Sequence, residues 1–437
     1  MRPPADRRPR RYGASVTSDE LSVLVVGANY APEPTGNAPY TTSLSRGLVE
    51  RGAVVRVITT FPHYPEWRIG EGYGGWSRRE RVDGVDVLRL RHFVPTSPTP
   101  VRRLLAELSF GLRASGVRWP TADVVLLVSP SLFSTAVAMA RLRVGRRLRR
   151  GGRRPGVVLW TQDLYSLGVE ETGTATGGQA RVVREVESWV VRGVDGIVTI
   201  HDRFAVHLKV CLGADERAVR TVRNWTHLRR TGSVDVPATR RRLGWPDGET
   251  VVLHAGNQGT KQGLANVVET ARLADERGAR VRFVLLGDGS QRTALETAAR
   301  GVRSIRFLDP LPDDEFPAAL AAADILLVNE ATGVAEMSVP SKLTSYFDAE
   351  RPVVAATSAA SVTAQEIAVS GGGVRVDAGR PAALLDAVLE LAADPARCRS
   401  LGAAGGRYRR DVLTEAAAVA TFHEWLEQHA VRAAGHG

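Results

Sequence analysis

Short apolar runs alternate along this chain with longer segments whose apolar residues have helical spacing. The apolar run 21–26 is followed by a predicted helix that ends near residue 51 and by a second apolar run at 54–59. A strand, a helix and a further strand in this order form a βαβ unit, which requires a parallel sheet with helices on its faces. The alternation therefore predicts an α/β fold, and it begins again near residue 250.

The apolar runs fall into two sets, which predicts two domains. Strands are predicted at 21–26, 54–59, 85–90, 124–128, 157–160 and 196–200, and then at 251–254, 281–286, 304–308, 324–328 and 352–356. In the second set, helices are predicted near 264–277, 290–299, 314–322, 341–349, 381–393 and 395–402. A chain of 437 residues also exceeds what one core usually organises. We therefore expect two Rossmann-like, doubly wound domains that face a central cleft.

Composition places the boundaries between these domains. The stretch 1–19 is rich in Arg and Pro, lacks the apolar core of a signal peptide and is predicted to be a disordered basic tail. The N-terminal domain is predicted over 20–223, an irregular linker over 224–247 and the C-terminal domain over 248–413. The last segment, 414–437, is predicted to be a helix long enough to return to the N-terminal domain.

The charge of the chain limits its partners. The net charge is +11 and the pI is about 10.3, which favours nucleic acid, an anionic membrane face or phosphorylated ligands. Only Lys209, Lys261 and Lys342 are lysines, whereas every other Lys+Arg position is an arginine. A lysine retained in such a chain marks a position that Arg would not fit. Cys211 and Cys398 lie far apart and form no metal or redox motif, which favours a reducing compartment.

A glycine-rich loop follows the predicted strand 251–254. Gly256, Gly259 and Gly263 fall within eight residues, so this backbone can approach a ligand closely. Helical spacing begins after Leu264, and a helix N-terminus is a ready anion site to which Lys261 adds a charge. Taken alone, the loop is equally consistent with an ordinary tight turn between a strand and a helix.

Two further loops are predicted at the same end of this sheet. Gly287 and Gly289 follow the next strand, and the segment 329–342 follows a later one. Pro340 and Ser341 open a predicted helix, because Pro suits the first helical turn. The carboxyl ends of parallel strands form one crevice, so three converging loops with two lysines predict a diphosphate site.

Five segments of the chain resemble one family. They are GANYAPEPTGNAPYTTSLSRGLVERGAVVRVITTFPHYPEW, WTQDLYS, HAGNQGTKQGL, LLGDGS and VPSKLTSYFDAERPVVA, in this order. In order and spacing they resemble the GT-B glycosyltransferases of family 4, in the branch of the colanic acid and O-antigen fucosyltransferases that builds bacterial exopolysaccharide. The resemblance covers about residues 20–425. It implies a GT-B fold and a transferase that takes a nucleoside diphosphate sugar as its donor.

The resemblance also implies roles for individual residues. Gly36 and Asn37 would close over the pyrophosphate of the donor from the N-terminal domain. Asn257 stands where many relatives carry an Arg, and Lys261 matches the lysine that accompanies it. Lys342 would also face the phosphates. The implied donor-binding set is Gly36, Asn37, Gly256, Asn257, Gly259, Lys261, Gln262, Gly287, Gly289, Phe307, Pro340, Ser341, Lys342 and Leu343.

This chain departs from the family pattern at the two signature carboxylates. Glu336 lies near the first carboxylate, which holds the donor sugar in the family. The place of the second, which holds the ribose, is taken by Ser345. Glu350 or Glu330 is a candidate to replace it.

The mechanism implied by the resemblance is transfer with retention of configuration. Lys261, Lys342 and backbone N–H groups would stabilise the leaving diphosphate, whose oxygen could deprotonate the acceptor. Asp163 would orient the acceptor hydroxyl, because it ends a predicted strand of the N-terminal domain. Glu336 completes the predicted catalytic set. The family works in general without a catalytic metal, so no metal or cofactor is expected.

Each candidate side chain also has a purely structural interpretation. Asp163 could be a helix N-cap, and Glu336 a solvated loop residue. His63 could belong to an aromatic cluster, His254 to the core and His201 to the N-cap region of a helix.

Basic residues of the N-terminal half suggest where an acceptor binds. The predicted helix 101–119 is amphipathic and basic, and arginines cluster over 141–154. They could attract the chain to the inner, anionic membrane face, where a glycan or polyprenyl-diphosphate-linked acceptor would lie. The alternative is a solvated basic helix end. We expect a cytoplasmic protein that is peripheral to this membrane.

Three other functions compete with the transferase. A sugar-nucleotide 2-epimerase shares the scaffold but needs no basic helix facing a membrane. A nucleic-acid-binding protein would explain the pI, but the arginines are scattered and no such motif is present, so no nucleic acid partner is expected. A Rossmann dehydrogenase would need G-x-G-x-x-G after its first strand, where this chain has Gly27, Ala28 and Asn29.

Overall fold

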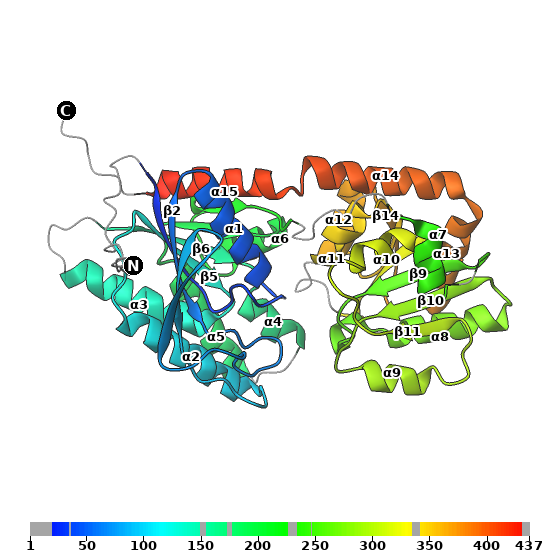
Figure 1. The fold of residues 1–437 in the computed structure, drawn as a ribbon, viewed down its shortest axis with the longest axis horizontal. Helices are drawn as coiled ribbons and strands as arrows, with labels where there is room; N and C mark the ends of the chain where they lie inside the picture. Colours follow the sequence, from blue (N-terminus) through cyan, green and yellow to red (C-terminus); the bar gives the residue numbers. More distant parts are fainter. Residues whose placement is uncertain are drawn as a thin grey trace, which may run out of the picture.

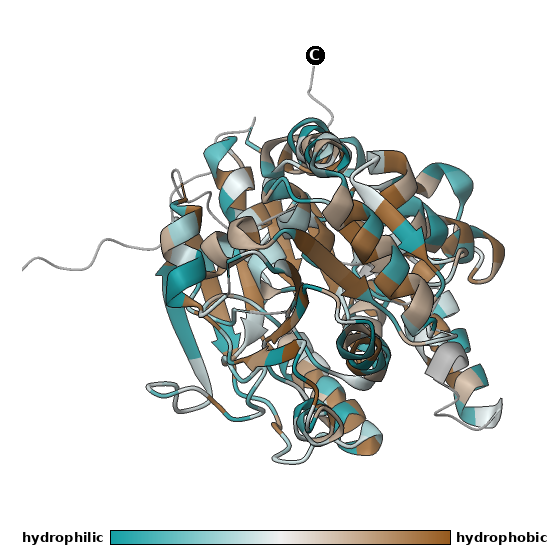
Figure 2. Ribbon diagram, turned by 90° about the vertical axis from the view of Figure 1, so that its right-hand side faces the viewer, coloured by the Kyte–Doolittle hydropathy of each residue, from teal (hydrophilic) through white to brown (hydrophobic). Residues whose placement is uncertain are grey.

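The computed structural model describes residues 20–34, 36–148, 154–172, 177–225, 234–245, 247–333 and 341–430. They form two α/β units that lie side by side, with two consecutive helices running along one edge of both (Figure 1). Apolar residues concentrate on the strands, whereas the helices carry both apolar and hydrophilic residues (Figure 2). The predicted α/β class with two parallel sheets is confirmed.

The N-terminal sheet has eight strands in the order β3-β4-β2-β1-β5-β6-β7-β8. Their bounds are β1 Ser22–Val26, β2 Val54–Thr60, β3 Ser77–Val82, β4 Val85–Leu90, β5 Val124–Ser129, β6 Gly156–Thr161, β7 Gly196–Thr199 and β8 Val219–Thr221. All neighbours pair in parallel except β3 and β4. The central strands β1, β5 and β6 are buried throughout, because helices cover both faces.

Six helices belong to this sheet. They are α1 Ala38–Glu50, α2 Pro100–Gly116, α3 Leu132–Leu148, α4 Tyr165–Thr172, α5 Gly177–Val191 and α6 Asp202–Val210. The buried side of α2 consists of Ala106, Phe110, Gly111 and Ala114. A Cβ at Gly111 would lie 2.9 Å from the Ser134 Cα, so α2 and α3 pack backbone to backbone. Leu105 and Leu112 of this predicted amphipathic helix therefore remain exposed.

The C-terminal sheet has six strands, all parallel, in the order β11-β10-β9-β12-β13-β14. Their bounds are β9 Thr250–Ala255, β10 Val281–Leu286, β11 Ile305–Leu308, β12 Ile325–Asn329, β13 Val353–Ala356 and β14 Gly373–Val376. The helices are α7 Val236–Arg242, α8 Ala265–Glu276, α9 Arg292–Ala298, α10 Phe316–Ala322, α11 Ser341–Asp348, α12 Val362–Ser370, α13 Pro381–Ala393 and α14 Pro395–Asp411. The order turns back at β9, so this sheet is doubly wound.

The last helix, α15 (Glu415–His429), returns to the N-terminal unit (Figure 1). Its Phe422 is fully buried and contacts Trp160 of β6 edge to face, with ring centroids 4.8 Å apart. On α1, a Cβ at Gly47 would lie 2.8 Å from Val419, so the two helices touch closely. The predicted return of the C-terminal helix is confirmed.

Two segments differ from the sequence prediction. The helix α7 lies within the segment predicted to be irregular, and it packs against α10, with Arg240 bound to Asp324 at 2.9 Å. The helix predicted at 395–402 continues to Asp411 as α14. Its glycines are required by close packing, because a Cβ at Gly402 would lie 2.7 Å from the Glu350 carbonyl carbon. Among the helices described, none is long and apolar enough to cross a bilayer.

Candidate functional site

At the carboxyl ends of β9 and β10, two loops approach so closely that no side chain fits between them. Gly256 and Gly287 have φ of +121° and +128°, which favour glycine. A Cβ at Gly287 would lie 2.9 Å from the Gly256 carbonyl carbon, and one at Gly289 would lie 2.7 Å from the Gln258 backbone. These glycines therefore bring the two loops together, as the sequence predicted.

Several N–H groups of these loops are already used inside the protein. Gly256 donates to Leu286 and Gly287 to Leu308, which continues the strand pairing by one residue. Gly259 donates to Gln262 Oε1 at 3.2 Å. These amides are therefore not free to bind a ligand, whereas the sequence predicted that backbone N–H groups would stabilise the diphosphate. The positive charge at this place comes mainly from side chains.

The loop after β9 is fastened to the end of β12. Asn329 Nδ2 donates to the carbonyls of Gln262 and Gly263 at 2.7 and 3.0 Å. Lys261 lies half-buried in the short 3-10 turn Thr260–Gln262, and its carbonyl accepts from Ala331 N at 2.8 Å. Asn257, in contrast, is exposed. Three of the predicted residues, Asn257, Lys261 and Gln262, therefore share one loop held at the sheet edge.

Lys342 lies at the centre of this edge. Its Nζ is 3.4 Å from His254 Nε2, and a Cβ at Gly256 would lie 3.8 Å from the same Nζ. Burial lowers the pKa of Lys342 to about 8, and Glu330 acts in the opposite direction. Within the described residues, no carboxylate forms a salt bridge with Lys342. A half-buried cation that forms no salt bridge with a described carboxylate favours an anionic ligand.

Glu330 follows β12 and is buried. Its two carboxylate oxygens accept hydrogen bonds from the hydroxyls of Thr357 and Thr363. Glu330 therefore lies at the same sheet edge as Lys342. Glu350, the other candidate for the missing carboxylate, pairs with Arg410 of α14 instead.

Phe307 and Arg292 mark the neighbouring end of β11. The Arg292 guanidinium carbon lies over the Phe307 ring, 5.3 Å from its centroid, and the guanidinium also donates to the Leu308 carbonyl at 3.1 Å. Phe307 is half-buried and packs against the core. Arg292 was not identified from the sequence, because only the fold brings it over this ring.

The start of α11 is described in part. Glu336 and Pro340 lie outside the described residues, and Ser341 is the first residue of α11. Leu343 is buried to 2% exposure and belongs to the core below the sheet, so its side chain packs and does not face a ligand. Ser345 lies about one turn after Ser341 on the same helix, at a half-buried position.

The predicted residues of the N-terminal unit lie beyond β1. Gly36 has a φ of +67°, and a Cβ there would lie 3.7 Å from the Tyr64 ring. Asn37 precedes α1 and is 7% exposed, and its Nδ2 donates to the Pro130 carbonyl at 3.3 Å. Asn37 therefore joins the loops after β1 and β5.

Asp163 follows β6 and is half-buried. Its Oδ1 accepts from Leu164 N at 2.9 Å. The first amides of α4 are capped by another residue, because Tyr165 N and Ser166 N donate to the Glu187 carboxylate at 2.8 and 3.0 Å. At the start of α4, the Glu187 carboxylate therefore binds the first two amides of the helix, and Asp163 binds the amide before them.

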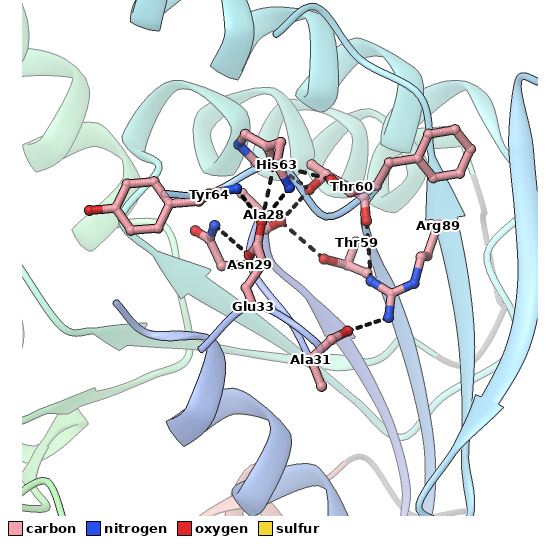
Figure 3. Close-up of polar contacts among 10 residues, drawn as sticks. Ala28, Asn29, Ala31, Glu33, Thr59, Thr60, His63, Tyr64 and Arg89 are labelled. Atoms are coloured by element: carbon pink, nitrogen blue, oxygen red, sulfur yellow. Dashed lines mark hydrogen bonds and ion pairs between the residues drawn. The ribbon is translucent and has the colours of Figure 1, made fainter. Parts of the chain in front are cut away.

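A buried polar cluster around the Glu33 carboxylate, which was not predicted from the sequence, lies at the ends of β1 and β2 (Figure 3). Glu33 Oε1 accepts from His63 N and Tyr64 N at 2.8 and 2.9 Å, and Oε2 accepts from Asn29 at 2.8 Å. Burial alone would raise the pKa of Glu33, but the hydrogen bonds from His63 and Asn29 hold it below its usual value. In the sequence, Glu33 lies in the segment APEP, and His63 and Tyr64 lie in the segment FPHYPEW.

His63 belongs to this cluster and to an aromatic group. Its Nδ1 lies 3.1 Å from the Phe61 carbonyl and 3.2 Å from Glu33, and its ring contacts His92 at 4.6 Å. Burial and the neighbouring His63 lower the pKa of His92 to about 3. The aromatic interpretation of His63 is thus confirmed, with the added bond to Glu33.

His201 is the N-cap of α6, where its Nδ1 accepts from Arg203 N at 3.1 Å. Its Nε2 lies 3.4 Å from Glu366 of α12, in the other unit. Arg223 and Tyr408 also bind Glu366, at 3.1 and 2.9 Å. Glu366 therefore links the two units.

The described residues contain no group of three or more His, Cys, Asp or Glu side chains that could hold a metal ion.

Two family models match the chain. The model described as "Glycosyl transferase 4-like domain" matches residues 35–225, and the model described as "Glycosyl transferases group 1" matches residues 249–394. Among curated proteins, the chain is 34% identical over 340 residues to WcaI of Escherichia coli (strain K12), which is described as a colanic acid biosynthesis glycosyl transferase. This match covers 74% of the chain and 80% of WcaI.

Solved structures share the fold at low identity. Sucrose-phosphate synthase from Thermosynechococcus elongatus has a TM-score of 0.68 and 16% identity, covering 94% of this chain and 99% of that one. HepE from Anabaena, in complex with UDP-glucose, has a TM-score of 0.66 and 14% identity, covering 94% and 100%.

Proposed function

The chain belongs to the glycosyltransferases, and from this premise we propose that it transfers a sugar from a nucleoside diphosphate donor to a glycan or polyprenyl-diphosphate-linked acceptor in cell-surface polysaccharide synthesis. The polysaccharide is suggested by the description of WcaI. The nucleotide donor is suggested by the UDP-glucose in the HepE complex.

One observation carries the donor site. Lys342 is a half-buried cation whose hydrogen-bond partner, His254, is neutral, and it lies beside the loop that carries Lys261. A diphosphate would supply the missing negative charge, and as leaving group it gains charge during the reaction. Cations placed in advance where charge develops stabilise the transition state.

The two lysines give a direct test of this site. Lys261→Ala and Lys342→Ala should each abolish turnover while leaving the melting temperature within a few degrees. The matched control is Lys209→Ala, because Lys209 lies on α6 of the other unit and pairs with Glu216 at 3.7 Å. Near-normal turnover in either site variant would refute its role.

The acceptor side of the proposal rests on the N-terminal unit. Asp163 would orient the acceptor hydroxyl, and Gly36 and Asn37 would cover the donor pyrophosphate. With retention, the bond between the anomeric carbon and the phosphate oxygen breaks, the acceptor oxygen bonds to the same face, and the hydroxyl proton passes to the leaving phosphate. Asp163→Asn should lower turnover and leave donor binding unchanged. The anomeric configuration of the product, read by NMR, tests retention.

The donor can be identified by thermal shift with UDP-, GDP- and dTDP-sugars. The proposal requires a raised melting temperature with at least one of them, and no shift with any would contradict it. An epimerase would convert the bound sugar nucleotide without an acceptor, so product analysis in the absence of acceptor separates that alternative.

We further propose that α2 docks on the anionic inner membrane face. Val101, Leu105 and Leu112 are 67%, 50% and 64% exposed on this helix, between arginines. Trp76 is 73% exposed beneath the Arg113 guanidinium, which lies 5.2 Å from its ring centroid. Apolar side chains with surrounding cations are the pattern of a helix that lies in a membrane interface.

The second predicted basic region contributes less to this surface. Arg141 lies 4.7 Å from the Trp119 ring centroid and Arg143 lies 4.1 Å from that of Trp189, so both cations are used in packing. The remainder of this cluster includes residues outside the described ranges.

Liposome flotation tests the docking surface. Binding should increase with the fraction of anionic lipid and fall when Leu105 and Leu112 are replaced by Ser. The matched control is Val369→Ser, a 58% exposed apolar residue on α12. Binding that ignores the anionic lipid content would contradict the proposal.

A further inference from the structure

We propose that His254 is a positioning residue that holds the Lys342 ammonium at the end of β9, ready for the phosphates of the donor. This inference rests on the proposed function of Lys342 and adds a residue that the sequence favoured as an ordinary core histidine. His254 does not itself touch the donor in this account. It acts through the contact between its Nε2 and Lys342 Nζ.

The hydrogen bonds of His254 determine which of its nitrogens can accept. The side chain is fully buried, and Nδ1 lies 3.3 Å from the Leu327 carbonyl, which only accepts. Nδ1 therefore carries the proton. Burial and the nearby Lys342 lower the pKa of His254 far below its usual value, so the ring is neutral. Nε2 then carries the lone pair and lies 3.4 Å from Lys342 Nζ, and the Asn257 backbone is a second backbone partner of the ring.

A neutral acceptor has a consequence that a carboxylate would not have. An ammonium bound to a carboxylate would be neutralised before the donor arrives, whereas one bound to imidazole keeps its charge for the ligand. Among the described residues, Glu330 is the carboxylate that acts on Lys342, and the hydroxyls of Thr357 and Thr363 donate to its oxygens. Tyr346, on the same helix as Lys342, accepts from the Ala255 amide at 2.9 Å.

The arrangement makes donor binding depend on pH. Since the pKa of Lys342 is about 8 in the free protein, the ammonium is the main form at pH 7 and a minor form at pH 9. Affinity scales with the fraction of protein that is competent to bind, so the Kd for a diphosphate should rise about tenfold from pH 7 to pH 9. Removing the imidazole acceptor should lower the pKa of Lys342 and move this rise to lower pH.

The test is isothermal titration of the full chain with inorganic pyrophosphate at pH 7 and pH 9. His254→Phe should weaken binding at pH 7 by about fivefold or more, whereas His254→Gln, whose amide oxygen can accept, should restore most of the affinity. Tyr346→Phe is the matched control, because it removes a neighbouring hydrogen bond that does not involve Lys342. It should leave the pH dependence unchanged.

A double-mutant cycle with Lys342→Met separates positioning from a merely structural role. If His254 acts through Lys342, His254→Phe has no further effect on pyrophosphate binding in the Lys342→Met background. An equal loss in both backgrounds would overturn the inference. If His254→Phe does not fold, the same cycle with His254→Leu decides, because leucine is smaller than histidine and also lacks an acceptor.

Failure of the proposed function gives a different result. Pyrophosphate binding by Lys342→Met equal to that of the unchanged chain would remove Lys342 from the donor site, and the inference about His254 would be refuted with it. A weakened Lys342→Met combined with a normal His254→Phe would refute the inference alone.

Discussion

Gly287→Ala is predicted to destabilise the C-terminal unit far more than a glycine-to-alanine change at a turn normally does. Gly287 has a φ of +128°, where a side chain costs roughly 1–3 kcal/mol. The added Cβ would also lie 2.9 Å from the Gly256 carbonyl carbon and 3.3 Å from its Cα. Backbone atoms cannot rotate away, and such overpacking costs about 1–3 kcal/mol more. The total is about 2–6 kcal/mol.

Gly301→Ala is the matched control. Gly301 also has a positive φ, +82°, but a Cβ there meets nothing within 4 Å. This variant therefore reports the backbone strain alone, about 1 kcal/mol. For a unit of this size, each kcal/mol lowers the melting temperature by about 2–4 °C.

Differential scanning fluorimetry would compare the two variants. We expect a loss of roughly 4–24 °C for Gly287→Ala and roughly 2–4 °C for Gly301→Ala. The first should also lose nucleoside diphosphate binding, because the two loops must separate. Equal melting temperatures for both variants would refute the close packing of the loops after β9 and β10.

Three further predictions test other parts of the molecule. Phe422→Ala should destabilise the chain by about 3–5 kcal/mol, because its fully buried ring leaves a cavity against Trp160; a small shift in urea midpoint would contradict this. Burial raises the pKa of Glu107 to about 7, so the folded state holds its proton and the stability of the chain falls as pH rises from about 4.5 to 7. Glu107→Gln, which can still accept from Tyr165, should flatten this part of the plot of melting temperature against pH. A plot parallel to that of the unchanged chain would contradict the role of Glu107. Glu366→Ala should loosen the link between the units and increase the radius of gyration in X-ray scattering; an unchanged scattering curve would count against it.

Strands that are buried on both faces could be predicted from the sequence. The run predicted at 281–286 is β10 with the same bounds, and the one predicted at 352–356 is β13 at Val353–Ala356. In contrast, β3 has the sequence SRRERV and was missed. It is an exposed edge strand that pairs with β4, so its sequence carries no apolar signal.

Helix lengths depended on packing that the sequence does not display. The helix predicted at 395–402 ended too early, and its observed continuation contains Gly405 and Gly406, a residue type that is unfavourable within helices. In the fold, Gly405 lies against Phe347 of α11, where a Cβ would meet the ring at 2.7 Å. Close contact between the two helices therefore keeps α14 continuous to Asp411.

The candidate site was predictable as a set of loops but not as a set of contacts. Glycine spacing identified the loops after β9 and β10, and the scarcity of lysine singled out Lys261 and Lys342. The pairing of Lys342 with His254 joins residues 88 positions apart. Only the fold brings such residues together, and the same holds for the bonds from Glu33 to His63.

A crystal structure of the chain with a bound nucleoside diphosphate tests the central claim most directly. UDP, GDP or dTDP would be chosen by the largest thermal shift. We predict that the phosphates contact Lys342 Nζ and Lys261 beside Gly256, with Nζ still bound to His254. Phosphates bound elsewhere, with Lys342 Nζ out of hydrogen-bonding distance, would contradict it.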